Sequence, residues 1–261
     1  MKKILIMPDV HGRDFWIEPV KKVINSEDYF IVFLGDYLSC YPYEWEPGID
    51  YNQIAIERFE EVLKFKNNNP EKVILLTGNH DLSYFNSNIC ECRTDWKNWD
   101  KINKMFFDNI KSFDLAWETK IGDKRYFFSH AGVKKGWFEN WVKDNLFKWD
   151  RDELPSADYF NNLFHTAYDD GRSFDTKFTH DFETAIGIYS TYRGWYGRDY
   201  GSIVWADIRE YGMGPEYDNV VFICGHTQLE EEPIIEKWVM DLDVRRPFVL
   251  DTETGKIEEY K

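Results

Sequence analysis

The chain opens with the stretch Met1-Lys2-Lys3-Ile4-Leu5-Ile6-Met7-Pro8-Asp9-Val10-His11-Gly12. Its apolar run, residues 4–7, is short and continuous, which is typical of a β-strand that is buried on both faces. Asp9 and His11 follow this run two positions apart, where the chain bends and both side chains can converge. The stretch therefore predicts a first buried strand with two candidate metal ligands at its carboxyl end.

The same arrangement recurs four more times along the chain. Residues 29–34 precede Asp36, residues 73–76 precede Asn79 and His80, residues 126–128 precede His130, and residues 220–223 precede His226. Helical spacing of apolar residues separates several of these runs, over 51–66 and near 96–111. Strand–helix alternation predicts an α/β fold with parallel pairing, in which ligands sit beyond the carboxyl ends of the strands. Each of these polar residues falls at such an end.

Other segments predict the organisation around these strands. Two β-hairpins are expected, over residues 115–128 with a turn at Gly122-Asp123, and over residues 248–257. The stretch from about 134 to 200 is helical and aromatic, and we expect it to be an insertion over the strand ends that shapes the substrate pocket. Because no Pro/Gly-rich linker marks it off, residues 1–261 are expected to form a single domain.

Composition excludes several classes of function. The net charge of -15 disfavours binding to long nucleic acids, since it repels the phosphate backbone. No apolar stretch approaches the roughly 20 residues of a membrane helix, and the start of the chain lacks a signal-peptide pattern. The four cysteines form no CxxC pair and no disulfide framework, so the expected compartment is a reducing cytoplasm. Nothing in the sequence indicates the oligomeric state.

The candidate ligands share a chemistry of carboxylate, amide and imidazole groups. This mixture of oxygen and nitrogen donors suits Mn, Fe or Zn. The absence of thiolates in the motifs argues against a closed structural zinc site.

The ordered motifs carry a resemblance to a known family. They are Asp9-Val10-His11-Gly12, Gly35-Asp36, Gly78-Asn79-His80-Asp81, Ser129-His130-Ala131-Gly132 and Gly225-His226-Thr227. In this order, each after a strand-like run, they resemble the calcineurin-like metallophosphoesterases, closest to the phosphoprotein-phosphatase (serine/threonine phosphatase-like) branch. The resemblance implies a four-layer αββα sandwich of two mixed sheets, with the helical insertion over the strand ends.

The resemblance also implies roles for individual residues. Asp9 and His11 would bind a first divalent metal ion, and Asp36 would bridge it to a second. The second ion would be bound by Asn79, His130 and His226. Mn is the expected metal, with Fe, Zn or Ni as alternatives. A metal-bound water or hydroxide would attack phosphorus, and His80 would be the catalytic general acid for the leaving oxygen.

One departure from the family pattern affects this picture. The family's Asp-Arg-Gly would fall at Ser39, Cys40 and Tyr41. The missing Asp normally orients the catalytic histidine, a role that Asp81 or Asp95 could take. The missing Arg normally grips phosphate; Arg193 is the expected substrate-binding replacement, with Arg245 as the second choice.

The leading hypothesis is a phosphatase-like hydrolase of phosphomonoesters, on a phosphorylated small molecule or on phosphoserine or phosphothreonine of a protein. Within the same class, the alternative is a phosphodiesterase or a dinucleoside polyphosphate hydrolase. The alternative of another class is a catalytically weak binding scaffold of the same fold. Loss of the Asp-Arg-Gly side chains favours the scaffold, and retention of all six ligand positions and His80 argues against it.

Overall fold

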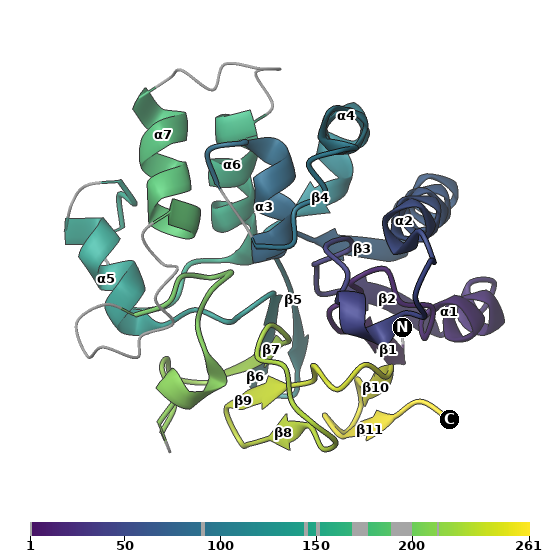
Figure 1. Cartoon of the computed structure of the whole chain (residues 1–261). Coiled ribbons are helices and arrows are strands. Elements are labelled where there is room, and N and C mark those ends of the chain that lie inside the picture. The colour runs from purple at the N-terminus through teal and green to yellow at the C-terminus, as the bar shows by residue number, and fades with distance from the viewer. Residues whose placement is uncertain are drawn as a thin grey trace. The chain divides into compact units, whose positions relative to one another are not determined.

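The computed structural model describes residues 2–89, 92–143, 146–149, 152–168, 177–188, 200–212 and 214–261 (Figure 1). By its internal contacts the chain divides into two compact units. One comprises Met1–Phe113 together with Arg245–Lys261, and the other comprises Asp114–Val244. Each unit contains one β-sheet and its own helices. The single-domain organisation stays a prediction.

A six-stranded sheet, in the order β11-β10-β1-β2-β3-β4, forms the centre of the first unit. Its strands are β1 (Lys3–Met7), β2 (Tyr29–Phe33), β3 (Val73–Leu76), β4 (Phe113–Asp114), β10 (Phe248–Asp251) and β11 (Ile257–Glu259). β1, β2 and β3 pair in parallel, whereas β10 pairs antiparallel with β1 and with β11. Residues 4–7 of β1 are fully buried. The predicted buried first strand and the predicted C-terminal hairpin are both confirmed.

Four helices accompany this sheet: α1 (Ile17–Val23), α2 (Tyr51–Asn68), α3 (Asn79–Phe85) and α4 (Trp99–Asp108). Short 3₁₀ turns occur at η1 (Pro42–Glu44) and η2 (Ile110–Ser112). The helices predicted over 51–66 and near 96–111 are α2 and α4. They meet through aromatic rings, because Phe59 of α2 lies 4.7 Å from Phe106 of α4 between ring centroids. Aromatic residues make up 18% of the chain, and at this contact they fill the core as offset aromatic pairs do in protein interiors.

The second unit contains a five-stranded sheet in the order β5-β6-β7-β9-β8. Its strands are β5 (Ala116–Ile121), β6 (Lys124–Ser129), β7 (Val220–Cys224), β8 (Ile234–Ile235) and β9 (Val239–Asp241). β5 and β6 form the predicted antiparallel hairpin, while β6, β7 and β9 pair in parallel. Both sheets are mixed, which confirms the predicted α/β class with two mixed sheets.

The described parts of residues 134–200 are largely helical, as expected. They contain α5 (Lys135–Lys143), α6 (Ala157–Tyr168), α7 (Lys177–Glu183) and the π-helical turn η3 (Thr184–Ile188). A 3₁₀ turn, η4 (Ile208–Glu210), follows further along. α6 is attached to β5 because the Asn161 side chain accepts from the amides of Leu115 and Ala116 and donates to the carbonyl of Ala116. A role of this segment in shaping the substrate pocket stays a prediction.

Within the described chain, every helix is too short or too polar to cross a lipid bilayer.

Candidate functional site

The loops that follow β1 and β2 run side by side. The amides of Val10, His11 and Gly12 donate to the carbonyls of Gly35, Asp36 and Tyr37, at 3.4, 2.6 and 3.0 Å. These bonds extend the parallel pairing of β1 and β2 past the ends of the strands. Asp9 and His11 are thereby placed beside Asp36, as the strand-end reasoning predicts, and all three side chains are buried.

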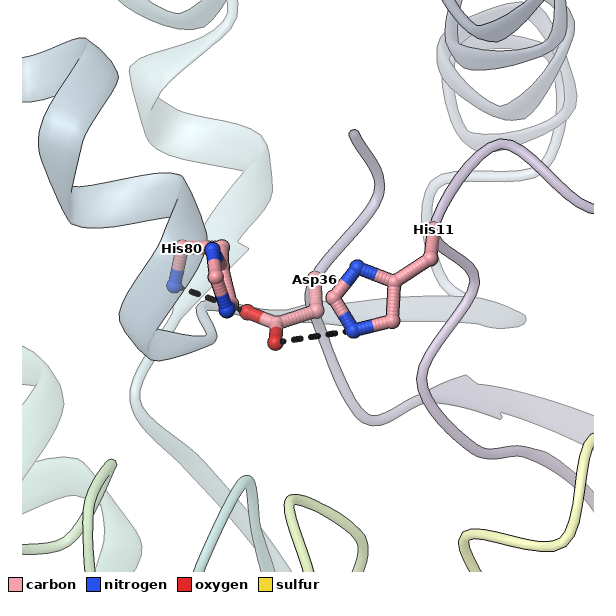
Figure 2. Close-up of side chains that lie close together, drawn as sticks. All are labelled: His11, Asp36 and His80. Atoms are coloured by element: carbon pink, nitrogen blue, oxygen red, sulfur yellow. Dashed lines mark hydrogen bonds and ion pairs between the residues drawn. The ribbon is translucent and has the colours of Figure 1, made fainter. Parts of the chain in front are cut away.

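His11 is held in one tautomer. Its Nδ1 lies 3.0 Å from the carbonyl oxygen of Leu38, which can only accept, so Nδ1 carries the proton and donates. Nε2 therefore presents a lone pair, 3.4 Å from Oδ2 of Asp36 (Figure 2). The same Nε2 lies 3.9 Å from Oδ2 of Asp9. Burial, followed by repulsion from His80 and nearby arginines, holds the pKa of His11 well below its usual value. A neutral imidazole oriented by a backbone carbonyl is the form that binds metals.

Asp36 is fixed from two sides. Its Oδ1 accepts from the backbone amide of His80 at 2.9 Å. The Asp81 carboxylate accepts from the amides of Asp36 and Gly78 at 2.8 Å and from that of Tyr37 at 3.1 Å. Burial raises the pKa of Asp81 to about 7, and the three amide donors act in the opposite direction. Gly78 approaches so closely that an added Cβ would lie 2.1 Å from Oδ1 of Asp36.

Three of the six predicted ligands have left-handed backbone conformations. The φ angles are 45° at His11, 54° at Asp36 and 70° at His226. Such angles are uncommon for residues other than glycine and cost of order 1–3 kcal/mol each, so they persist only where the surrounding structure imposes them. Their concentration at candidate ligands indicates that the backbone is bent to aim these side chains.

The amino end of α3 brings two further predicted residues to Asp36. Asn79 and His80 are the first two residues of this helix, and both are buried. The His80 ring packs edge-on against the His11 ring, with 5.2 Å between centroids. One ligand-type atom from each of His11, Asp36 and His80 lies within 4.8 Å of the others (Figure 2). The structure thus groups His80 with two candidate metal ligands.

In the unit Asp114–Val244, the remaining two predicted ligands meet. His130 follows β6 and His226 follows β7, and these strands are parallel neighbours. Nε2 of His130 lies 3.2 Å from Nδ1 of His226, and both residues are buried. At this distance the two rings are hydrogen-bonded in this structure, and two nitrogen ligands at about 2.1 Å from one cation would lie at a similar separation. The pair is therefore compatible with joint binding of one cation.

The donor sets fit divalent cations. Around His11, a nitrogen lone pair and two carboxylate groups face one another in a buried place. A cation satisfies acceptors that converge in this way, because burying negative charge without a counter-charge is costly. Among the described residues these sets contain no thiolate. The identity of the metal stays a prediction.

The structure gives different surroundings to the residues predicted to replace the missing Asp and Arg of the family pattern. Arg193 lies outside the described residues, and Arg245 is 3.5 Å from the carboxylate of Glu44. Asp95 accepts from the backbone and side-chain amides of Asn98, so its carboxylate stabilises the turn between these two residues. Asp81, as described, holds the loop at Asp36.

Sequence reasoning missed Arg93. Its Nη2 lies 2.9 Å from Nε2 of His80, its Nε donates to the carbonyl of Ser39 at 3.0 Å, and its guanidinium lies 3.8 Å from the centroid of the Tyr41 ring. Arg93 lies in the connection between α3 and α4 and belongs to no motif. No signal in the sequence marks it, because only the tertiary fold brings this connection back to His80.

Comparisons with known proteins relate the chain to one family and to solved structures of a similar fold. The model of the calcineurin-like phosphoesterase family matches residues 2–228, whereas no curated protein sequence matches. Among solved structures, a cold-active protein tyrosine phosphatase is similar, with 17% identity, a TM-score of 0.54, and coverage of 99% of this chain and 78% of that chain. A protein serine/threonine phosphatase from Saccharomyces cerevisiae has 14% identity, a TM-score of 0.52, and coverage of 100% and 80%.

At these identities the structural likeness shows a shared fold, and the family match supplies the classification. Members of this family are hydrolases of phosphoesters that depend on divalent metal ions, which the donor sets described above can bind. The family match extends over most of the chain, including all five motifs. The chain belongs to the calcineurin-like phosphoesterase family.

Proposed function

We propose that this protein is a phosphomonoesterase that acts with two divalent cations. The proposed ligands are Asp9, His11, Asp36, Asn79, His130 and His226. One observation carries the proposal: His11, locked by Leu38 into the tautomer with a free Nε2 lone pair, faces two buried carboxylates. The spacing of the His130 and His226 nitrogens supports it independently.

The residues of the chain have distinct roles in the proposed reaction. When bound, divalent cations neutralise phosphoryl oxygens and lower the pKa of coordinated water. Asp36 is held rigidly by the His80 amide and, through its own amide, by Asp81, so it can keep its position as charge develops on the substrate. Because Nε2 of His80 accepts from Arg93, the proton lies on Nδ1, and His80 is proposed to donate this proton to the leaving oxygen, a step that general acids accelerate by about 10²–10⁴-fold. Mn is the proposed metal.

The proposed substrates are phosphomonoesters of small molecules or of phosphoserine and phosphothreonine in proteins. The test is turnover of p-nitrophenyl phosphate and of bis(p-nitrophenyl) phosphate by Mn-loaded protein, together with metal content by mass spectrometry. Wild type is expected to bind two metal equivalents and to prefer the monoester.

His80→Ala is expected to retain the metals and to lose about 10²–10⁴-fold in kcat. His180→Ala is the matched control, because His180 is an exposed residue of α7. Faster turnover of the diester would favour the phosphodiesterase alternative. Two bound metals with no turnover of either ester would contradict the enzyme proposal and favour a binding scaffold.

A further inference from the structure

Arg93 is held beside His80 by three contacts on different parts of its side chain. Nε donates to the carbonyl of Ser39, the guanidinium plane lies over the ring of Tyr41, and Nη2 faces Nε2 of His80. The side chain is half-buried. Fixing a long side chain costs conformational entropy, so this position is maintained by specific contacts. The guanidinium is therefore preorganised beside His80, which itself lies close to the candidate metal ligands His11 and Asp36.

The charge of Arg93 is unusual among the arginines that the structure describes. Seven arginines lie in the described part of the chain, and the other six each have a carboxylate oxygen at 2.5–3.5 Å. Arg93 has no carboxylate partner among the residues that the structure describes. In a chain with a net charge of -15, carboxylates are abundant, yet none of those in the described residues forms an ion pair with this guanidinium, so its charge remains available to an anionic ligand.

The guanidinium also retains unused donors. It has five N–H groups, of which Ser39 takes the one on Nε and His80 takes one on Nη2. Nη1 has only the Cys92 sulfur, a weak acceptor at 4.0 Å, within the described residues. Nη1 and Nη2 of the rigid guanidinium thus keep N–H donors for one more acceptor group. The oxygens of a phosphate group match the geometry of these two nitrogens.

We propose that Arg93 binds the phosphoryl oxygens of the substrate and selects phosphomonoesters over phosphodiesters. This inference rests on the proposed function of the same site. A monoester dianion has one more charged, unesterified oxygen than a diester. The electrostatic attraction between a fixed guanidinium and the phosphoryl group is therefore stronger for the monoester. The guanidinium is supplied from the connection between α3 and α4, and the loop at Ser39 and Tyr41 holds it.

The direct test is binding of inorganic phosphate to Mn-loaded protein by isothermal titration calorimetry. Arg93→Met removes the charge and the donors but keeps an apolar chain for Tyr41, and Arg93→Lys keeps the charge without the fork. Arg246→Met is the matched control: it removes a partly buried guanidinium from the same unit, one that is paired with Glu259 at 3.4 Å. Thermal melts by circular dichroism check that each variant folds.

Arg93→Met is expected to weaken phosphate binding by about 10- to 100-fold, Arg93→Lys by an intermediate factor, and Arg246→Met not at all. The same variant is expected to lose more kcat/KM on p-nitrophenyl phosphate than on its bis ester. If Arg93→Met does not fold, the phosphate affinity of Arg93→Lys decides, and an affinity equal to that of wild type overturns the inference.

Unchanged phosphate affinity in Arg93→Met would overturn the proposal, even with a lower kcat, because Arg93 would then act only through His80. A wild-type protein that binds no phosphate would also overturn it. Failure of the proposed function has a different signature. If wild type binds phosphate through Arg93 but turns over neither ester, the inference is supported and the enzyme proposal is contradicted.

Discussion

Replacing Gly78 by alanine should disable the candidate metal site through steric conflict alone. The backbone of Gly78, with φ -94° and ψ 175°, is a conformation that alanine adopts freely, so the substitution causes no backbone strain. The new Cβ, however, would lie 2.1 Å from Oδ1 of Asp36, where ordinary contact begins at 3.4 Å. Either the Asp36 carboxylate or the start of α3 must move by about 1 Å, a displacement that can cost about 10²-fold in rate.

The stability cost can be worked from the same contacts. Overpacking a closely packed position costs about 1–3 kcal/mol, and the charge-assisted bond from the His80 amide to Asp36 contributes about 1.5–3 kcal/mol. Since part of each loss is recovered by relaxation, we expect the free energy of unfolding to fall by about 3 kcal/mol. For a chain of this size that corresponds to a decrease in Tm of roughly 6–12 °C.

The assay combines thermal melts, Mn stoichiometry and kcat/KM on p-nitrophenyl phosphate. Gly212→Ala is the control, because no described atom lies within 4 Å of its added Cβ. We expect Gly212→Ala to resemble wild type. The reasoning would be refuted if Gly78→Ala kept wild-type metal content and activity, since Asp36 would then tolerate a displacement that the proposed site forbids.

Three further outcomes follow from other contacts. Lys134→Met should lower the free energy of unfolding by about 3 kcal/mol, because Lys134 is buried and pairs with Glu216. Adding Glu216→Gln to this variant should recover most of the loss. Additive losses in the double mutant would show that the two groups are not coupled. Mn at about 100 times its Kd should raise the free energy of unfolding by about 2.7 kcal/mol, and a chelator should reverse this increase. A Tm that does not depend on Mn would argue against a metal site. Asp50→Ala should cost about 1 kcal/mol in urea unfolding, because the Asp50 carboxylate caps α2 through the Gln53 amide; no change in the midpoint would contradict that role.

The strands and their polar ends could be predicted from the sequence because their signals are local. A continuous apolar run such as residues 4–7 identifies a buried strand wherever it lies, and a parallel sheet places the residues after its strands at one edge. The proximity of His11 to Asp36, and of His130 to His226, follows from this rule. The roles of these residues as metal ligands stay predictions.

Other features depend on contacts that the sequence does not encode locally. Asp81 was considered as a partner for His80, yet its carboxylate accepts from three backbone amides, two of them more than 40 residues away. Arg93 reaches His80 only because the chain after α3 folds back. The tautomer of His11 depends on the carbonyl of Leu38, and backbone carbonyl positions carry no sequence signature.

The left-handed angles at His11, Asp36 and His226 have a consequence for how this protein could be altered. Glycine would relieve about 1–3 kcal/mol of backbone strain at each of these positions. It would also leave a void in a buried place and remove a contact, such as the bond from the His80 amide to Asp36. The strain and the buried contacts therefore oppose each other in energy, and a selection for heat resistance alone has no clear reason to enrich glycine there.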